Sequence, residues 1–356
     1  MSRKPNNPDL KVLSPFNNRQ LDLFRSFLCS EADREKLSNA IDLWDSIPRY
    51  SVSRQEQNKR RDASGALPVL VLNFEYRGRP YTAEILPAKI KDADGTTRDY
   101  YPSANEELVE DALRKLATRQ NRGFFEPDKF RSGVAFSLYE LREELAARHH
   151  ARSYQEIIQS LLILRRAGIV LRTADGDTGS FAEASYLPAL AAVTRRTLKE
   201  DPNARWVVQF HPLVTQSIDQ VTYRQFNYEV MMTLSSQLAR WLHKQLTIKF
   251  TFAGLAANPF EMRYTTIKRD SCLLNRNRER DNIRDVEEAL SSLVAKRVLR
   301  EVQRNPITAA RGKIVEVIYR LYPTSEFVKE IKAANKRLQD AKIAVVGLGR
   351  GSAGFQ

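Results

Sequence analysis

The sequence predicts an α+β protein built from two tandem winged helix-turn-helix domains. Three observations lead to that prediction. One helix-start signature occurs three times between residues 103 and 156. The helices that it opens alternate with short strands in the order of a winged helix. The spacing of their apolar residues then returns 129 positions later in the chain, which indicates a repeated unit.

The helix-start signature is S-x-x-E, a capping box. Its Ser hydroxyl and its Glu carboxylate each satisfy backbone N–H groups that a helix start leaves without partners. It occupies residues 103–106, 137–140 and 153–156, and apolar residues at helical spacing follow each copy. We therefore expect three helices that begin at these boxes.

Short strands are expected around the second and third of these helices. Residues 134–136 are a strand candidate, Gly168 can end the third helix, and residues 169–172 read as a strand before a wing turn at 174–179. This order is that of a winged helix-turn-helix. The alternative is a small α+β domain without a DNA function, because a fold alone does not establish a function.

The repeat covers all three helices. The 129-residue shift lays apolar positions of the third helix and of the following strand, Tyr154, Ile157, Leu161, Leu164 and Ile169, onto Ile283, Val286, Leu290, Leu293 and Val298. It also lays Val109, Ala112 and Leu113 of the first helix onto Leu238, Trp241 and Leu242, and Leu138 and Leu145 of the second onto Ile267 and Leu274. Because one shift serves several helices, we interpret the chain as two copies of one domain.

The predicted organisation has four parts. Residues 1–60 form a flexible N-terminal segment with a linker helix, and residues 61–212 form the first winged helix with an extra β-hairpin at 67–86. Residues 213–325 form the second winged helix, and 326–356 a C-terminal helix and flexible tail.

Finer expectations within these parts concern short segments. We expect a helix within 31–66 that is followed by a charged linker at 54–61. Further along the chain we expect a strand at 206–210 and a helix start at 222–225. We also expect a helix at 231–246, a strand at 246–252 and a second wing between 298–302 and 314–319. Residues 342–354 resemble a dinucleotide loop, but Ser352 replaces its third glycine, so we read them as tail.

Composition favours a nucleic-acid partner. The 356 residues include 57 Lys and Arg against 43 Asp and Glu, a net charge of +14, and no apolar stretch is long enough to span a membrane. Cys29 and Cys272 lie far apart, and the start lacks a signal peptide, which suggests a cytoplasmic protein. We expect no metal, no cofactor and no enzymatic activity, since no nucleophile with a base and no ligand cluster is evident.

In the first unit, residues at the start of the third helix are expected to contact DNA: Arg152, Ser153, Tyr154, Gln155 and Gln159. Arg reads guanine and Gln reads adenine, and the N-terminal half of a recognition helix reaches the base edges. Tyr154 can instead belong to the core. Arg165 and Arg166 can bind phosphates or form a solvated helix end.

In the second unit, a charged stretch precedes and opens the corresponding helix. It is expected to supply phosphate and base contacts from Lys268, Arg269, Arg276, Arg278, Arg280, Asn282 and Arg284. The alternative is a solvated loop, which is what most charge runs are.

A pentapeptide near the N-terminus, residues 20–24, reads Gln20, Leu21, Asp22, Leu23 and Phe24. It resembles the bacterial sliding-clamp binding motif. Leu23 and Phe24 are apolar anchors for a pocket, and Gln20 supplies an orienting amide. Read in isolation, the same pattern is that of a helix that packs on a core.

The pentapeptide, the residues 136–141 with the helix that follows from 152 to 164, and residues 233–240 together resemble plasmid replication initiators of the TrfA type. That resemblance implies binding of double-stranded DNA at direct repeats of an origin and opening of AT-rich DNA. It also implies recruitment of the sliding clamp, the replicative helicase and the host initiator, and homodimers that repress their own promoter. The alternative is a winged-helix transcriptional repressor without a replication role, for which the clamp motif would have no use.

Overall fold

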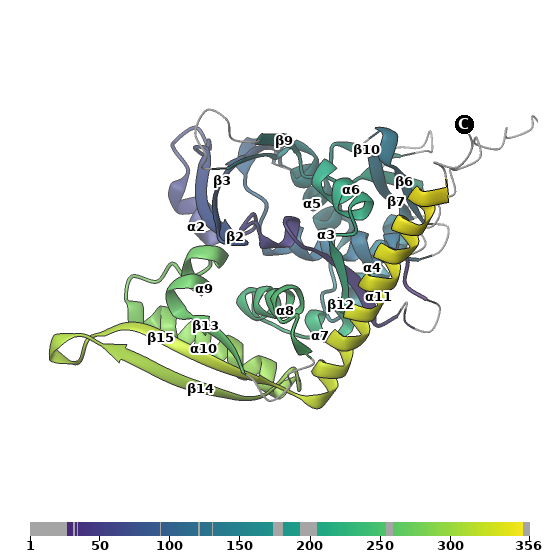
Figure 1. Cartoon of the computed structure of the whole chain (residues 1–356). Coiled ribbons are helices and arrows are strands. Elements are labelled where there is room, and N and C mark those ends of the chain that lie inside the picture. The colour runs from purple at the N-terminus through teal and green to yellow at the C-terminus, as the bar shows by residue number, and fades with distance from the viewer. Residues whose placement is uncertain are drawn as a thin grey trace, which may run out of the picture.

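The computed structural model describes residues 27–30, 33, 35–92, 94–119, 122–129, 131–173, 181–192, 205–253 and 259–351. It is an α+β structure with two winged-helix units, as the sequence predicts. Figure 1 shows the first unit, purple to teal, above the second unit, green to yellow. The two units meet along helices α3 and α8.

The first unit contains the three predicted helices, α3 (Ala104–Ala117), α4 (Leu138–Ala147) and α5 (Tyr154–Arg166). All three capping boxes form. In the third, the backbone N–H of Glu156 donates to the Ser153 Oγ over 3.2 Å, while the Glu156 carboxylate accepts from the backbone N–H of Ser153 over 2.8 Å. The local signature therefore determines where each helix begins.

The predicted hairpin is present and extends the wing sheet of this unit. That sheet has the order β2-β3-β8-β9, with β2 (Leu70–Tyr76), β3 (Arg79–Leu86), β8 (Gly168–Thr173) and β9 (Phe181–Ser185). The hairpin turn places Arg77 and Gly78 at φ of 51° and 74°. Two left-handed residues match the right-handed twist of the strands that they join.

A second sheet backs α3 with the order β10-β11-β7-β6. Its strands are β6 (Gly123–Glu126), β7 (Arg131–Ser137), β10 (Ala189–Ala192) and β11 (Arg205–Gln209). A Cβ added at Gly133 on β7 would lie 2.0 Å from the backbone oxygen of Val208 on β11. Only glycine fits at this point of the paired strands.

The second unit repeats the order of the first. Its elements are α8 (Gln237–Lys249), β13 (Phe260–Arg263), α9 (Tyr264–Ser271), α10 (Glu279–Ala295), β14 (Leu299–Thr308) and β15 (Ile314–Pro323), with a short turn η5 (Ala310–Gly312) at the wing tip. The 129-residue shift carries the start of β7 onto the start of β13, and α5 onto the part of α10 from Ile283 onward. The predicted duplication is confirmed.

The expectations for residues 31–66 are wrong. The expected helix is a strand, β1 (Leu37–Ile41), followed by a short turn η1 (Trp44–Ser46), and the expected linker is the helix α2 (Arg54–Arg60). All five residues of β1 are buried. Its sequence, Leu-Ser-Asn-Ala-Ile, includes two buried polar residues and lacks the apolar–polar alternation that would indicate a strand. The described residues of this segment are therefore structured rather than flexible.

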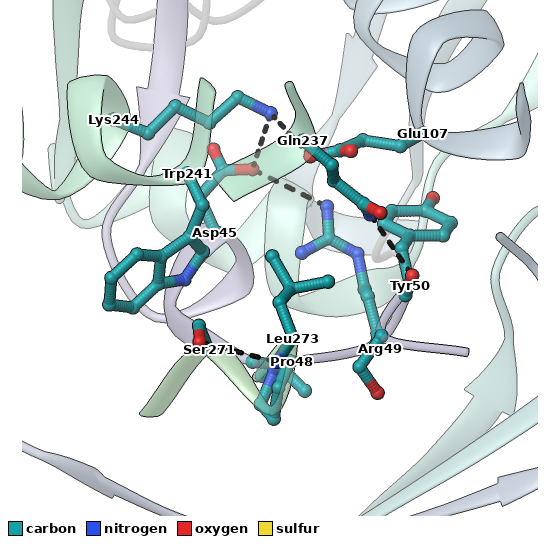
Figure 2. A pocket seen from close by; sticks show the side chains of 12 residues that line it. Asp45, Pro48, Arg49, Tyr50, Glu107, Gln237, Trp241, Lys244, Ser271 and Leu273 are labelled. Carbon is teal, nitrogen blue, oxygen red and sulfur yellow. Dashed lines mark hydrogen bonds and ion pairs between the residues drawn. The ribbon is translucent and has the colours of Figure 1, made fainter. Parts of the chain in front are cut away.

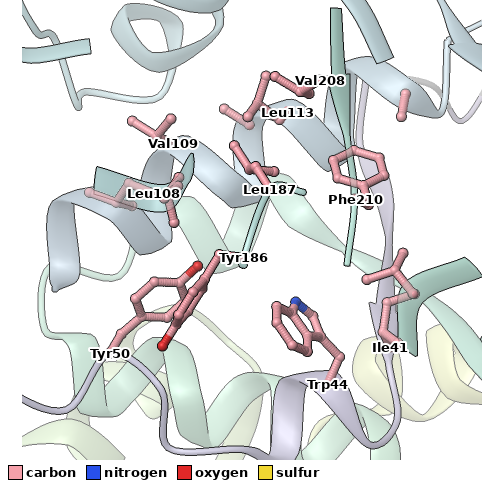
Figure 3. Packing of buried hydrophobic residues seen from close by; sticks show 14 of the residues in the cluster. Ile41, Trp44, Tyr50, Leu108, Val109, Leu113, Tyr186, Leu187, Val208 and Phe210 are labelled. Carbon is pink, nitrogen blue, oxygen red and sulfur yellow. The ribbon is translucent and has the colours of Figure 1, made fainter. Parts of the chain in front are cut away.

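The partner of β1 lies far away in the sequence. It is β12 (Tyr223–Asn227), which pairs antiparallel with it where a helix start was expected, and α7 (Tyr228–Met232) begins only afterwards. With α6 (Pro212–Asp219), these elements belong to the first core, while the second core begins at Leu234. Figure 3 shows part of this first core around Trp44 and Tyr186. The predicted domain boundary at 212 therefore precedes the division of the two cores.

Two further expectations fail at the C-terminal side. Helix α8 continues to Lys249, so residues 246–249 are not a strand. Helix α11 (Ser325–Gly351) continues through the first ten residues of the expected tail. It runs back beside β12 of the first unit (Figure 1), where the Asn227 side chain donates to the Glu330 carboxylate over 2.7 Å. The C-terminal helix thus ties the two units together.

The contact between α3 and α8 contains a buried network of charges. Four acids and four bases have side chains at most 9% exposed: Asp45, Glu107, Glu110, Asp111, Arg49, Arg114, Arg240 and Lys244. Arg114 binds Asp45 through two hydrogen bonds of 2.7 and 2.8 Å. From α8, the Lys244 ammonium reaches both oxygens of Asp111 at 2.9 and 2.7 Å. Figure 2 shows Lys244 and Arg49 around Asp45.

Asp45, Glu110 and Lys244 in this network are held in their charged forms by oppositely charged neighbours. Burial by itself would raise the pKa of Asp45, but Arg114 and Lys244 hold that pKa well below its usual value. Burial would likewise raise the pKa of Glu110, yet Arg49 and Arg114 lower it to about 2. Burial lowers the pKa of Lys244, but Asp111 and Asp45 raise it above its ordinary value.

Removing one member of the network should therefore be costly. Replacing Lys244 by Met should lower the free energy of unfolding by about 3–5 kcal/mol, because it deprives the buried Asp111 of a partner. The matched surface pair is Arg304 with Glu287, whose side chains are 40% and 39% exposed. Arg304→Met should cost at most about 1 kcal/mol. Urea unfolding at pH 7 compares the two, and equal costs would contradict the role given to the network.

Acid should destabilise the protein before its carboxylates titrate. Burial lowers the pKa of His211 and that of His243 to about 3. The unfolded chain then binds more protons below pH 6.5, so stability falls as the pH drops from about 6.5 towards 3, by up to about 1.4 kcal/mol per pH unit for each histidine. Protonation of Glu110, whose folded pKa is lowered by its ion pairs, reduces the free energy of unfolding further only below about pH 4.5.

Replacing His243 by Leu should flatten the dependence of stability on pH between 7 and 5, since its ring lies between Phe226 and Phe327. The exposed His149 replaced by Gln serves as the control and should leave that dependence unchanged. Urea unfolding at pH 7, 6 and 5 measures both. An unchanged slope in the His243 variant would show that this histidine is not buried in its neutral form.

Candidate nucleic-acid interface

Exposed arginines surround the start of helix α10 in the second unit. The side chains of Arg276, Arg280 and Arg284 are 62%, 74% and 60% exposed, and Arg278 is exposed at the N-cap position. Arg276 and Arg278 lie in the loop between α9 and α10, whereas Arg280 and Arg284 lie on the helix itself. In a helix-turn-helix, this loop and this first turn are the parts that reach a DNA groove.

Carboxylates on the same helix hold some of these guanidinium groups in the absence of DNA. Arg276 binds Asp285 at 2.9 Å, and Arg284 lies 3.4 Å from Asp281. Exposed ion pairs of this kind contribute about 0–1 kcal/mol each. The arginines can therefore exchange these carboxylates for DNA phosphates at little cost.

Asn282, which the sequence analysis expects to contact DNA, is instead fully buried. Its Oδ1 accepts from the backbone N–H of Arg276 over 2.8 Å, and its Nδ2 donates to the backbone oxygen of Arg276 over 3.1 Å. We therefore assign Asn282 to holding the loop that presents the arginines, and not to contacting DNA.

Lys268 and Arg269 both lie on α9, but they contact different parts of the molecule. Lys268 pairs with Glu279 in the first turn of α10, so it belongs to the arginine group. Arg269 pairs with Asp270 at 2.7 Å and with Glu75 on β2 of the first unit. The structure thus places Arg269 in the contact between the two units.

In the first unit, the expected residues lie at the start of α5. Several of their polar groups, however, already have hydrogen-bond partners within the protein. Gln155 is exposed, and the 129-residue shift carries it onto Arg284, which is also exposed. Ser153 forms the capping box, and Arg152 donates to Asn105 on α3 over 2.9 Å. Tyr154 packs partly against the first core, with the guanidinium of Arg142 5.1 Å from its ring centre.

A ribbon that the sequence did not predict covers part of α5. This ribbon consists of β4 (Ala88–Lys91) and β5 (Thr97–Tyr100), and α5 packs against β4. Gln159 contacts Asp92 at 3.4 Å, and Arg166 donates to the backbone oxygen of Lys89 over 2.8 Å. Gln159 and Arg166 therefore anchor the ribbon, while Arg165 is half-buried.

The ribbon also brings two cations to this surface. Ala88 and Ile90 are buried against the unit, whereas Lys89 and Lys91 are exposed. This alternation has the period of a half-buried strand and was readable in the sequence. Lys89 and Lys91 are the basic residues that the sequence analysis did not include.

Three other expectations concern the clamp-like pentapeptide, a metal site and a membrane-spanning helix. Gln20, Leu21, Asp22, Leu23 and Phe24 lie outside the residues that the structure describes. Within the described residues, no group of three or more His, Cys, Asp or Glu is placed to hold a metal ion. No helix in that part of the chain is both long enough and apolar enough to cross a membrane.

Arg276 and Arg278 should act mainly on phosphates. Replacing each by Gln should weaken binding to every duplex, and should flatten the slope of log K against log salt by about 0.9 for each phosphate that the variant no longer neutralises. Arg131→Gln on β7, also an exposed arginine paired with a glutamate, is the control and should change neither quantity. Fluorescence anisotropy at several salt concentrations provides the measurement. Unchanged slopes in both loop variants would remove this loop from the interface.

Comparison with known proteins gives structural matches only. No family model matches the chain, and no curated protein sequence matches it. A crystal structure of domains 2 and 3 of RctB aligns with a TM-score of 0.48 at 11% identity, over 75% of this chain and 98% of that one. A crystal structure of the Pi initiator protein in complex with iteron DNA aligns with a TM-score of 0.42 at 11% identity, over 68% and 98%. Each is a solved structure to which this chain is similar.

Proposed function

We propose that this protein binds double-stranded DNA sequence-specifically through the first turns of α5 and α10. It would do so without enzymatic activity, in the cytoplasm, and as an initiator of plasmid replication that binds repeated sites at an origin. The observation that carries the DNA-binding part is the exposed arginine group at the start of α10, on a winged-helix unit whose partner unit presents Gln155 at the equivalent turn.

The chemistry of these two turns suits different tasks. Arginine donates two hydrogen bonds to guanine and glutamine pairs with adenine, so Arg284 and Gln155 are suited to reading bases. Arg276, Arg278 and the ribbon lysines are suited to phosphates, which set affinity and orientation but not sequence preference. Because the network between α3 and α8 fixes the two units, both turns would engage one DNA molecule at a set separation.

The replication role rests on the clamp-like pentapeptide and on the family resemblance of the sequence. Recruitment of the sliding clamp, the replicative helicase and the host initiator belongs to this proposal, as does homodimer formation. The rival is a transcriptional repressor with the same DNA-binding units. It needs no contact with a clamp.

Selection from a random duplex library tests the DNA-binding function. The chain should enrich one sequence and bind it at physiological salt at least about 1,000-fold more tightly than unrelated duplex. Arg284→Ala and Gln155→Ala should each cost about 1–3 kcal/mol on that sequence and relax the preference at one base pair. Failure to enrich any sequence, or variants with unaltered preference, would contradict the proposal.

The clamp contact is tested by replacing Leu23 and Phe24 together by Ala. The variant should lose binding to purified bacterial sliding clamp while it keeps its melting temperature and its affinity for the selected duplex. Leu13 and Phe16, which precede the motif, replaced together by Ala provide the control. A double variant that melts earlier and loses DNA binding would instead place these residues in a core helix. A chain that binds DNA but never binds the clamp would favour the repressor.

A further inference from the structure

The wing of the second unit is a long ribbon that leaves the body of the molecule. Strands β14 and β15 pair over ten residues each, and Figure 1 shows their turn projecting to one side, away from the helices. From Gln303 to Ala310, every residue is exposed. The core of this unit supports the base of the ribbon through Val317, Tyr319 and Leu321, none of which is exposed.

Two large apolar side chains lie exposed on the outer part of this ribbon. Ile307 is 46% exposed and Val315 is 50% exposed, whereas Val317, two residues further along β15, is completely buried. Pro306 precedes Ile307 and is exposed as well. The strand register shifts between Ile307 and Thr308, which leaves Val315 without a direct partner. Such a bulge redirects the side chains next to it.

The charged residues on the outer part of the ribbon are cationic, and the carboxylates nearest to them are already engaged. Glu316, the strand partner of Ile307, accepts from Thr265 of α9, and Glu287 of α10 pairs with Arg304 at 2.6 Å. From Val302 to Val315 the chain carries Arg304, Arg311 and Lys313 and no Asp or Glu. This excess of cations does not favour a second copy of this basic chain as the partner. It favours DNA, which carries phosphates on both sides of its grooves. A strand pair with apolar residues between cations matches proteins that insert apolar side chains between base pairs from the minor groove.

We infer that Pro306, Ile307 and Val315 form an apolar wedge that enters the minor groove beside the site read by α10 and partly unstacks a base step. The inference rests on the proposed DNA binding and adds a deformation to it. Arg304 and Lys313 would hold the adjoining phosphates while the apolar side chains take the place of stacked bases. Pyrimidine–purine steps such as TA unstack most readily, so an AT-rich flank is the DNA that fits.

The test uses the full chain and the duplex enriched by selection, with 2-aminopurine at successive flanking positions and dyes at its two ends. The wild-type chain should raise the fluorescence at one or two neighbouring positions, which reports unstacking. It should also bend the duplex by roughly 20–90°. The double variant Ile307→Ser, Val315→Ser should lose both signals, and Ile307→Leu should keep them.

Affinity should change less than deformation in the serine variant, by under about tenfold, because the cost of unstacking disappears together with the contact. The matched control replaces Val69 and Val71 by Ser, which are 50% and 57% exposed in the first unit. This control should keep both signals. Melting temperatures of all variants should equal that of the wild type, since none of these side chains is buried.

The outcomes separate the two proposals. A wild-type chain that binds no duplex overturns the proposed function. A wild-type chain that binds specifically but neither unstacks nor bends the flank overturns the wedge alone, as does a serine variant that retains both signals. If the serine variant instead converts a dimer into a monomer in sedimentation while deformation persists, the occupant of this surface is a second copy of the chain, and the wedge is also overturned.

Discussion

The bidentate contact between Arg114 and Asp45, extended by Lys244 on Asp111, is the constraint on which the arrangement of the two units depends. In this network the first unit and its N-terminal segment contribute four acids and two bases, and α8 of the second unit contributes the other two bases, Arg240 and Lys244. The charges balance only when α3 and α8 face each other. Sliding or separating the units would strand buried charges, which costs several kcal/mol for each ion.

That constraint has a consequence for recognition. A winged-helix protein with two reading helices must present them at a separation that matches the DNA helix, or only one can engage. Flexible linkage would lower the gain from the second contact, whereas the network and helix α11 fix the separation before DNA arrives. The exposed parts of the molecule, the α10 arginines and the wing ribbon, are then carried on a rigid body.

Local signals in the sequence predicted the local structure well. Each S-x-x-E box opens a helix, because Ser153 and Glu156, for example, need no distant partner to form their bonds. The repeat was also readable, since both units bury the same helix faces. Residues such as Leu161 and Leu290 occupy equivalent core positions, and each is at most 1% exposed.

Non-local structure could not be predicted in the same way. Strand β1 is buried along its whole length, so its sequence has no alternation, and its partner β12 lies nearly two hundred residues away. Some residues of the candidate site were assigned the wrong role for the same reason. Asn282 resembles a groove residue but holds a loop, and Gln159 and Arg166 are engaged by a ribbon that packs on α5 only in the folded chain. Charge pattern alone does not tell which polar groups the protein itself satisfies.

Hydroxyl-radical footprinting of the intact chain on its selected duplex tests the central claim most directly. Two winged helices held at a fixed separation should protect two patches on one face of the DNA, with their centres about 10–10.5 base pairs apart or a whole multiple of that distance. A single protected patch, or two patches on opposite faces, would contradict the account of one rigid body with two reading helices.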